Sequence, residues 1–140
     1  MKQLHLFTDG GARGNPGPAG IGICVKEGDI TILEHAEYLG KQTNNWAEYQ
    51  GLVRGLEEVA RHYGDALKDR AVVVHMDSEL IVKQMNGVYR VKDAELKKQH
   101  AKARALIDAS FPHITFKHVR REHNKDADRL ANEAMDRGGE

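Results

Sequence analysis

The sequence predicts a mixed α/β domain in which helices flank a β-sheet. Short apolar or alternating runs are interleaved with segments of helical spacing, giving three strands, a helix, a strand, helices, a strand and a helix. The chain has 140 residues, of which 40% are hydrophobic and 30% charged, and these values are ordinary for one folded domain. We therefore expect residues 1–140 to form a single domain.

Three strands are predicted in the N-terminal third. The first ends at Asp9, and the Gly- and Pro-rich residues 10–20 are expected to form a loop, because Pro blocks regular structure and Gly allows unusual dihedrals. Residues 20–26 and 30–39 form the next two strands. Residues 27–29, Glu-Gly-Asp, suit the hairpin turn between them.

The middle of the chain predicts a long helix and then a buried strand. The helix begins near residues 43–45, since Thr and Asn are good N-caps, and its apolar spacing lasts to about residue 63. The run AVVVHMD at residues 71–77 is continuously apolar and β-branched, so we expect a strand buried on both faces.

The C-terminal half predicts two capped helices, a strand and a last helix. Ser78 begins a short helix that ends at Gly87, and Asp93 begins a longer helix that ends before Phe111. The alternating run HITFKHV then forms a strand. The last helix spans about residues 124–135.

Charge and cysteine content exclude few classes of function. Lys plus Arg equals Asp plus Glu at 21 each, so a nucleic-acid site would need a local arrangement of charge. Cys24 is the single cysteine, which excludes an internal disulfide, and its apolar surroundings predict a buried thiol. No apolar run approaches the ~20 residues of a membrane span, and the N-terminus does not resemble a signal peptide. We expect a cytoplasmic monomer with no membrane partner.

Four acidic residues lie where predicted elements begin or end. Asp9 and Asp77 end strands, where open α/β sheets place ligand crevices. Glu48 lies on the core-facing stripe of the long helix, and Asp128 lies on the inner face of the last helix. Together they suit a site for Mg²⁺, which prefers oxygen ligands, and two ions about 3.5–4 Å apart can serve an in-line displacement. The alternative is that each acid merely caps a loop or faces solvent.

Four sequence blocks, TDGGARGNPGPAGIG, TNNWAEYQGL, MDSELIVKQMNG and REHNKDADRLANEAM, resemble in order the signature blocks of type 1 ribonucleases H. The resemblance covers essentially the whole chain. It implies the ribonuclease H-like fold, a five-stranded mixed sheet in β-β-β-α-β-α-β-α order. It also implies hydrolysis of the RNA strand of RNA–DNA hybrids, leaving 3′-hydroxyl and 5′-phosphate ends.

The resemblance also assigns roles to residues. It implies that four acids bind two Mg²⁺ ions, for which Mn²⁺ can substitute: Asp9, Glu48, Asp77 and Asp128. It implies that five residues grip the hybrid: Gly14, Asn15, Thr43, Asn44 and Asn45. Small residues admit the backbone closely, and Asn and Thr can bond phosphates and 2′-hydroxyls.

Several features depart from the best-studied family members. Residues 85–90 lead quickly to the next helix, so a basic handle is missing, as in a compact subgroup of the family. Glu79 stands where many members have Gln. His123, five residues before Asp128, can either shuttle a proton as a catalytic residue or be a surface residue at a helix start. Arg120 and Arg121 would place positive charge beside the acids, either to attract phosphate or merely to neutralise neighbouring acids.

Two other functions remain open. Without the handle, the chain can be a nucleic-acid-binding protein with little catalysis. It can also be another two-metal phosphotransferase of the same fold, such as an integrase, resolvase or exonuclease. Retention of all four acids argues against pure binding, and the intact TNN-x-x-E and DS blocks argue against the other enzymes.

Overall fold

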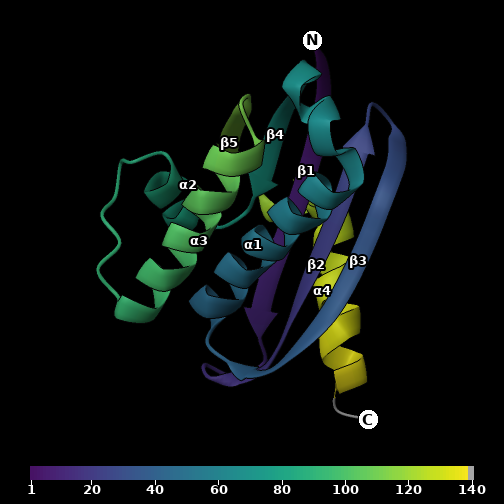
Figure 1. The fold of residues 1–140 in the computed structure, drawn as a ribbon. Helices are drawn as coiled ribbons and strands as arrows, with labels where there is room; N and C mark the ends of the chain where they lie inside the picture. Colours follow the sequence, from purple (N-terminus) through teal and green to yellow (C-terminus); the bar gives the residue numbers. More distant parts are fainter. Residues whose placement is uncertain (139–140) are drawn as a thin grey trace.

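The computed structural model describes residues 1–138, which form one five-stranded sheet with helices on both faces (Figure 1). The strands are β1 (Lys2–Ala12), β2 (Gly17–Glu27), β3 (Ile30–Gln42), β4 (Arg70–Met76) and β5 (Ile114–His118). The helices are α1 (Asn44–Tyr63), α2 (Glu79–Met85), α3 (Ala94–Ser110) and α4 (Lys125–Gly138), with short 3₁₀ turns η1 (Gly64–Asp69) and η2 (Arg121–His123). The predicted mixed sheet is confirmed, and the segment between β4 and β5 forms two helices.

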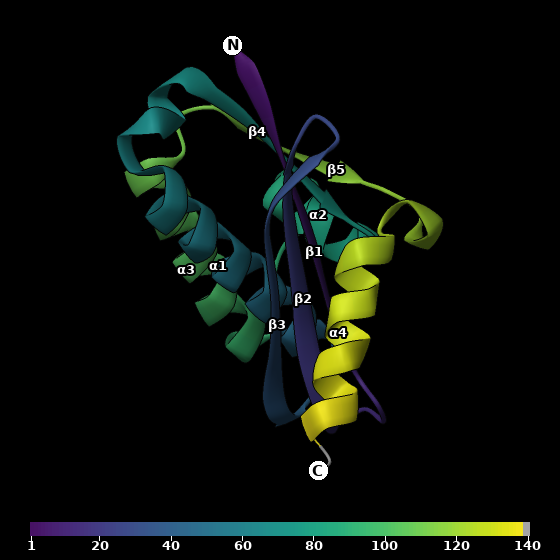
Figure 2. The ribbon, with the colours of Figure 1, turned by 90° about the vertical axis from the view of Figure 1, so that its right-hand side faces the viewer.

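The strand order in the sheet is β3-β2-β1-β4-β5. β1 pairs with β2 in antiparallel and with β4 in parallel orientation, and β4 pairs with β5 in parallel orientation. Helices α1 and α3 lie together on one face of the sheet, and α4 lies on the other (Figure 2). Because β1 and β4 are parallel neighbours, residues at their carboxyl ends lie at the same edge of the sheet.

The predicted helix starts are confirmed by their capping bonds. The Thr43 hydroxyl accepts a hydrogen bond from the Trp46 amide at 3.2 Å, at the beginning of α1. The Ser78 hydroxyl and the Asp93 carboxylate cap α2 and α3 in the same way. Each cap satisfies amide groups that the helix itself leaves without acceptors, so a local sequence signal was sufficient here.

The predicted loop over residues 10–20 was wrong in extent. β1 continues to Ala12 and β2 begins at Gly17, so that only residues 13–16 connect them. Gly10 and Gly22 lie within strands and allow close packing rather than a turn. A Cβ on Gly10 would lie 2.2 Å from the carbonyl oxygen of Ala47 in α1, and one on Gly22 would lie 2.0 Å from that of Ala127 in α4.

The prediction that the fourth strand is buried on both faces was confirmed only in part. Val72, Val74 and Met76 are buried on one face, whereas on the opposite face His75 is buried but Val73 is only half-buried. The reason is the position of α4, which packs on β2, β3 and β1. Part of the sheet over β4 and β5 is therefore left without a covering helix.

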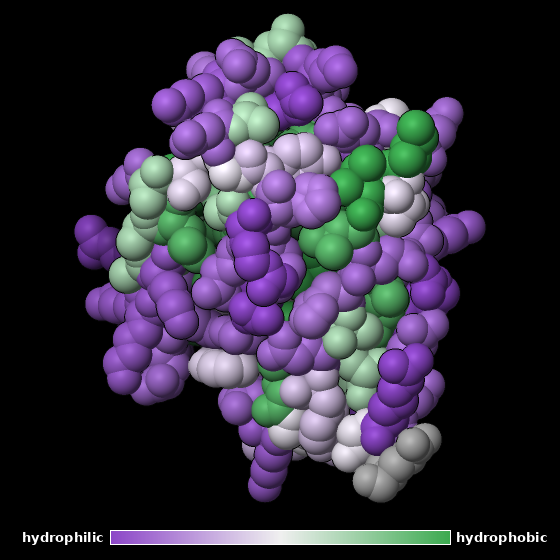
Figure 3. Space-filling view, turned by 45° about the vertical axis from the view of Figure 1, so that its right-hand side comes forward, coloured by the Kyte–Doolittle hydropathy of each residue, from purple (hydrophilic) through white to green (hydrophobic). Residues whose placement is uncertain are grey.

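The hydrophobic core lies mainly between the sheet and α1 and α3, around residues such as Leu6, Leu52 and Val74. Cys24 is buried as predicted, and burial raises the pKa of its thiol to about 11. On the face drawn in Figure 3, groups of hydrophobic residues are separated by hydrophilic ones. Among the described helices, none has the length and apolar character required to cross a membrane.

Candidate active site

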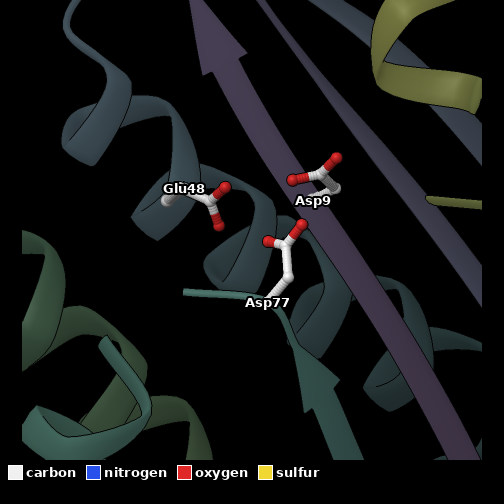
Figure 4. Close-up of side chains that lie close together, drawn as sticks. All are labelled: Asp9, Glu48 and Asp77. Carbon is white, nitrogen blue, oxygen red and sulfur yellow. The ribbon is translucent and has the colours of Figure 1, made fainter. Parts of the chain in front are cut away.

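Three carboxylates from different elements meet at one edge of the sheet. Asp9 lies in β1, Glu48 in the second turn of α1, and Asp77 directly after β4. Their side chains point toward one another in Figure 4, and one oxygen atom from each lies within 4.8 Å of the others. The structure thus brings together three of the four acids that the sequence placed at one site.

Close packing of α1 on β1 produces this convergence. Gly51 lies one turn after Glu48, and a Cβ there would be 2.9 Å from the carbonyl oxygen of Asp9. Together with Gly10, it allows the helix backbone to approach the strand more closely than side chains would permit. The close approach sets Glu48 beside Asp9, while parallel pairing of β1 with β4 brings Asp77 to the same point.

The cluster is costly without a cation. Burial, with Asp77 and Asp128 nearby, raises the pKa of Asp9 from 3.8 to about 7, although a hydrogen bond with Glu48 lowers it. Burial and the neighbouring Asp9 raise the pKa of Glu48 well above its ordinary value. Burial also raises the pKa of Asp77, against the opposing effect of Arg121. Low-dielectric surroundings and mutual repulsion both disfavour the charged forms.

Asp128 joins the site from α4. It lies outside the group within 4.8 Å, but it lines the same cavity and is close enough to raise the pKa of Asp9. Asn124, at the start of α4, donates from Nδ2 to the carbonyl oxygen of Thr8 at 3.0 Å. This buried bond ties the first turn of α4 to the residue before Asp9.

These acids line a cavity of about 660 Å³ whose rim is basic. Arg13, Arg120 and Arg121 are among its lining residues. Nε of Arg121 lies 3.8 Å from the nearer carboxylate oxygen of Asp77. An acidic centre with a basic rim suits a ligand that carries phosphate groups and binds together with cations.

The acidic centre also fits a hard divalent cation. All its donor atoms are carboxylate oxygens, the ligand type that Mg²⁺ prefers. One carboxylate oxygen of Glu48 is buried without a hydrogen-bond partner, which is a costly arrangement for an atom that binds nothing. A cation would supply that partner and offset the repulsion between the carboxylates.

Comparison with known proteins gives the family. A family model described as reverse transcriptase-like matches residues 7–134. Ribonuclease H of Nitrosomonas eutropha is 31% identical over 97% of this chain and 91% of its own length. The chain belongs to the ribonuclease H family. A bifunctional protein of Mycobacterium tuberculosis is 42% identical over 96% of this chain, which spans only 36% of that relative's length.

Solved ribonucleases H share the whole architecture. The structure of LC11-RNase H1, isolated from compost, has a TM-score of 0.94 and 48% identity and covers 100% of both chains. The same protein was solved in complex with an RNA/DNA hybrid, with 47% identity over 98% of this chain and 99% of that one. RNase H1 of Halobacterium salinarum has a TM-score of 0.87 and 37% identity, covering 96% of this chain and 98% of that one.

Two of the five residues that the family resemblance assigned to the hybrid lie beside the acids, and two more lie in an adjoining hollow. Asn44 and Asn45 line the cavity of the acids. They also line an adjoining hollow together with Asn15 and Thr43. Side-chain oxygens hold the two loops together, because Asn15 accepts from the Asn44 amide at 3.1 Å and Asn44 accepts from the Ala12 amide at 2.8 Å. Gly14, in the same connection as Asn15, lines neither of these hollows and has a φ of 101°, which favours glycine.

His123 lies outside the cavity of the acids. It is exposed and lines a separate hollow with Phe7, His75 and Lys117, and it is absent from the lining of the cavity of the acids. This placement favours the surface alternative for His123. Glu79 is likewise engaged elsewhere, in an ion pair with Lys83 at 2.7 Å.

Sequence reasoning missed Arg13. Its guanidinium donates to the Asn132 side chain at 3.3 Å and pairs with Asp136 at 2.5 Å, so that it joins the first loop to α4 at the cavity rim. Asn132 in turn donates to the backbone carbonyl of Asp128 at 2.9 Å. A charged residue within a Gly- and Pro-rich segment was the one signal that could have indicated it.

In agreement with the missing handle, residues 86–93 between α2 and α3 form a loop.

Proposed function

We propose that this chain hydrolyses the RNA strand of RNA–DNA hybrids, with Asp9, Glu48, Asp77 and Asp128 as the catalytic acids. The convergence of three carboxylates within 4.8 Å carries the proposal, because a repelling buried cluster is explained by cation-dependent chemistry. Membership of the ribonuclease H family supports it, as does the complex of LC11-RNase H1 with an RNA/DNA hybrid.

The acids would hold Mg²⁺, with Mn²⁺ as a substitute. When bound, the ions supply Lewis acidity at the scissile phosphate and lower the pKa of water. Asp9 and Glu48 extend from rigid elements, so their oxygens are already in place before substrate binds. Asp77 is also rigidly placed, since it follows the last residue of β4. Preorganised charge avoids a reorganisation cost during the reaction.

The residues around the acids would orient the hybrid. The side chains of Asn44 and Asn45, in the first turn of α1, offer amide donors to a phosphate in the cavity, where the positive end of the helix dipole also favours negative charge. The side chains of Asn15 and Thr43 extend this polar surface along the adjoining hollow. Their donors and acceptors suit sugar and phosphate groups, so we expect recognition by shape with little sequence specificity.

Arg121 can act on phosphate once cations occupy the acids. In the described structure its guanidinium is held near the Asp77 carboxylate. A cation bound by Asp77 would weaken this attraction and leave Arg121 at the cavity rim, available to the substrate. The side chain is largely exposed, so its movement costs little packing energy.

The test is cleavage of a hybrid labelled on either strand, with Mg²⁺, with Mn²⁺ or with EDTA. We expect metal-dependent cutting of the RNA strand alone and its loss in Asp77→Asn. Asp108→Asn, which neutralises an exposed acid on α3, is the matched control and should cut normally. A folded protein that cuts neither strand with either metal would contradict the proposal and favour a binding function.

A further inference from the structure

A second hollow lies behind the connection between β5 and α4. Its volume is about 470 Å³, and its lining residues are Phe7, His75, Lys117, His118, Val119, Arg120 and His123. Phe7 and His75 alternate along their strands with Leu6 and Val74, which are buried beneath α1. The hollow therefore lies on the opposite face of the sheet, on the part that α4 leaves uncovered.

The lining is basic although the chain as a whole has a formal net charge of zero. The positive charge comes from Lys117 and Arg120, which are exposed, while three histidines add polar ring nitrogens to the lining. Among the described residues, the lining contains no Asp or Glu. The nearest acidic partner of Arg120 is Glu122, at 4.0 Å, and both side chains are exposed, so the pair is weak. The surplus of positive charge makes the hollow suitable for an anion.

Aromatic rings form the floor of the hollow. The rings of Phe7 and His75 stack with centroids 4.4 Å apart and planes at 10°. His75 is also held by a hydrogen bond between its Nε2 and Nδ1 of His5, at 2.9 Å. The floor is thus rigid as well as partly apolar. An aromatic surface beneath exposed cationic side chains suits a ligand with both a phosphate and an apolar ring or sugar, such as a nucleotide.

The hollow adjoins the cavity of the acids. His118, Val119 and Arg120 line both, so residues 118–120 form the wall that separates them. A strand whose scissile phosphate lies at the acids can pass over this wall into the hollow. In the proposed reaction that strand is the RNA, whereas the DNA strand is paired with it inside the duplex.

We propose that the hollow binds a single-stranded stretch of the RNA that continues from the cavity of the acids over residues 118–120. Lys117 and Arg120 bind its phosphates, and Phe7 and His75 contact its sugar or base. This assignment rests on the proposed function for the identity of the strand. It adds a site outside the duplex, so a hybrid with an unpaired RNA extension binds more tightly than a blunt one.

The test compares hybrids that share one duplex, in EDTA so that no strand is cut. One hybrid is blunt. Two others each carry a single RNA extension of about six nucleotides, at the 5′ end in one and at the 3′ end in the other. Two more carry DNA extensions of the same length in the same way. We expect one RNA extension to lower the dissociation constant, measured by fluorescence anisotropy, about five- to tenfold. Because phosphate contacts release counterions, this gain should shrink as salt increases.

Lys117→Glu should abolish the gain and leave binding of the blunt hybrid nearly unchanged, since Lys117 does not line the cavity of the acids. Lys68→Glu, the same charge change at an exposed residue before the start of β4, is the matched control and should keep the gain. Thermal melting of each variant establishes that it is folded.

Several outcomes overturn the inference. Equal affinity for blunt and extended hybrids would do so, as would equal effects of the two lysine variants or a gain from a DNA extension alone. Single-stranded RNA serves as a further probe, and its binding should weaken in Lys117→Glu even if no duplex binds. Cleavage and blunt-hybrid binding report separately on the proposed function, so that the two failures are distinguishable.

Discussion

Replacing Asp9 by Asn should stabilise the metal-free protein while it removes a catalytic acid. Burial, together with the nearby charges of Asp77 and Asp128, raises the pKa of Asp9 from 3.8 to about 7. Its Oδ1 accepts a hydrogen bond from the Gly10 amide at 2.9 Å, and the amide oxygen of Asn can keep this bond. The substitution therefore removes charge with little change of shape.

The magnitude follows from the shift in pKa. The folded protein retains a proton that the unfolded chain releases above about pH 3.8. The free energy of unfolding consequently falls as pH rises from that value to about 7, and it stays low at higher pH. One pKa unit corresponds to about 1.4 kcal/mol, so the ionised Asp9 costs up to about 4 kcal/mol. Asp9→Asn should therefore raise the free energy of unfolding by most of this amount near pH 8 and by less than half of it near pH 5.

Urea unfolding in EDTA, followed by circular dichroism at both pH values, measures the difference. Asp108→Asn, at an exposed site on α3, is the control and should change stability by no more than about 0.5 kcal/mol. The reasoning would be refuted if Asp9→Asn were destabilising near pH 8, or if its effect were the same at both pH values. Either result would mean that the charge of Asp9, buried near other acids, does not destabilise the metal-free protein.

Three further outcomes are expected. Mg²⁺ should raise the melting temperature of the wild type near pH 8 but raise it less in Glu48→Gln, because the amide loses a charged ligand beside a buried, unpartnered oxygen. Asn124→Ala should cost about 1–3 kcal/mol in urea unfolding, since it removes the buried bond to the Thr8 carbonyl. Gly22→Ala should cost at least about 2 kcal/mol, because the added methyl would lie 2.0 Å from the Ala127 carbonyl oxygen.

Controls for these outcomes use nearby positions. Gly11→Ala places its methyl 3.9 Å from the single neighbour within 4 Å, the side chain of Asn44, so it should be well tolerated. Equal losses in Gly11→Ala and Gly22→Ala would exclude close packing as the cause. An equal Mg²⁺ response in wild type and Glu48→Gln would place the ion elsewhere. Unchanged stability in Asn124→Ala would show that α4 is held in place by its other contacts.

The candidate site shows how far sequence reasoning reaches. The acids were predicted to meet because each lies at an end of an element, and the structure confirms the meeting of Asp9, Glu48 and Asp77. The prediction could not give the strand order, which brings β1 beside β4. It also could not place His123, because a residue just before a helix can face either side of the connecting segment.

The sequence by itself determined what depends on neighbouring residues. Thr43, Ser78 and Asp93 begin helices because their side chains bond amide groups three residues or fewer away. Tertiary structure alone decided the role of glycines such as Gly10 and Gly22, the uncovered part of the sheet, and the basic hollow beside β5. These features depend on where α1 and α4 pack against the sheet, and such packing joins residues far apart in the chain that no local pattern relates.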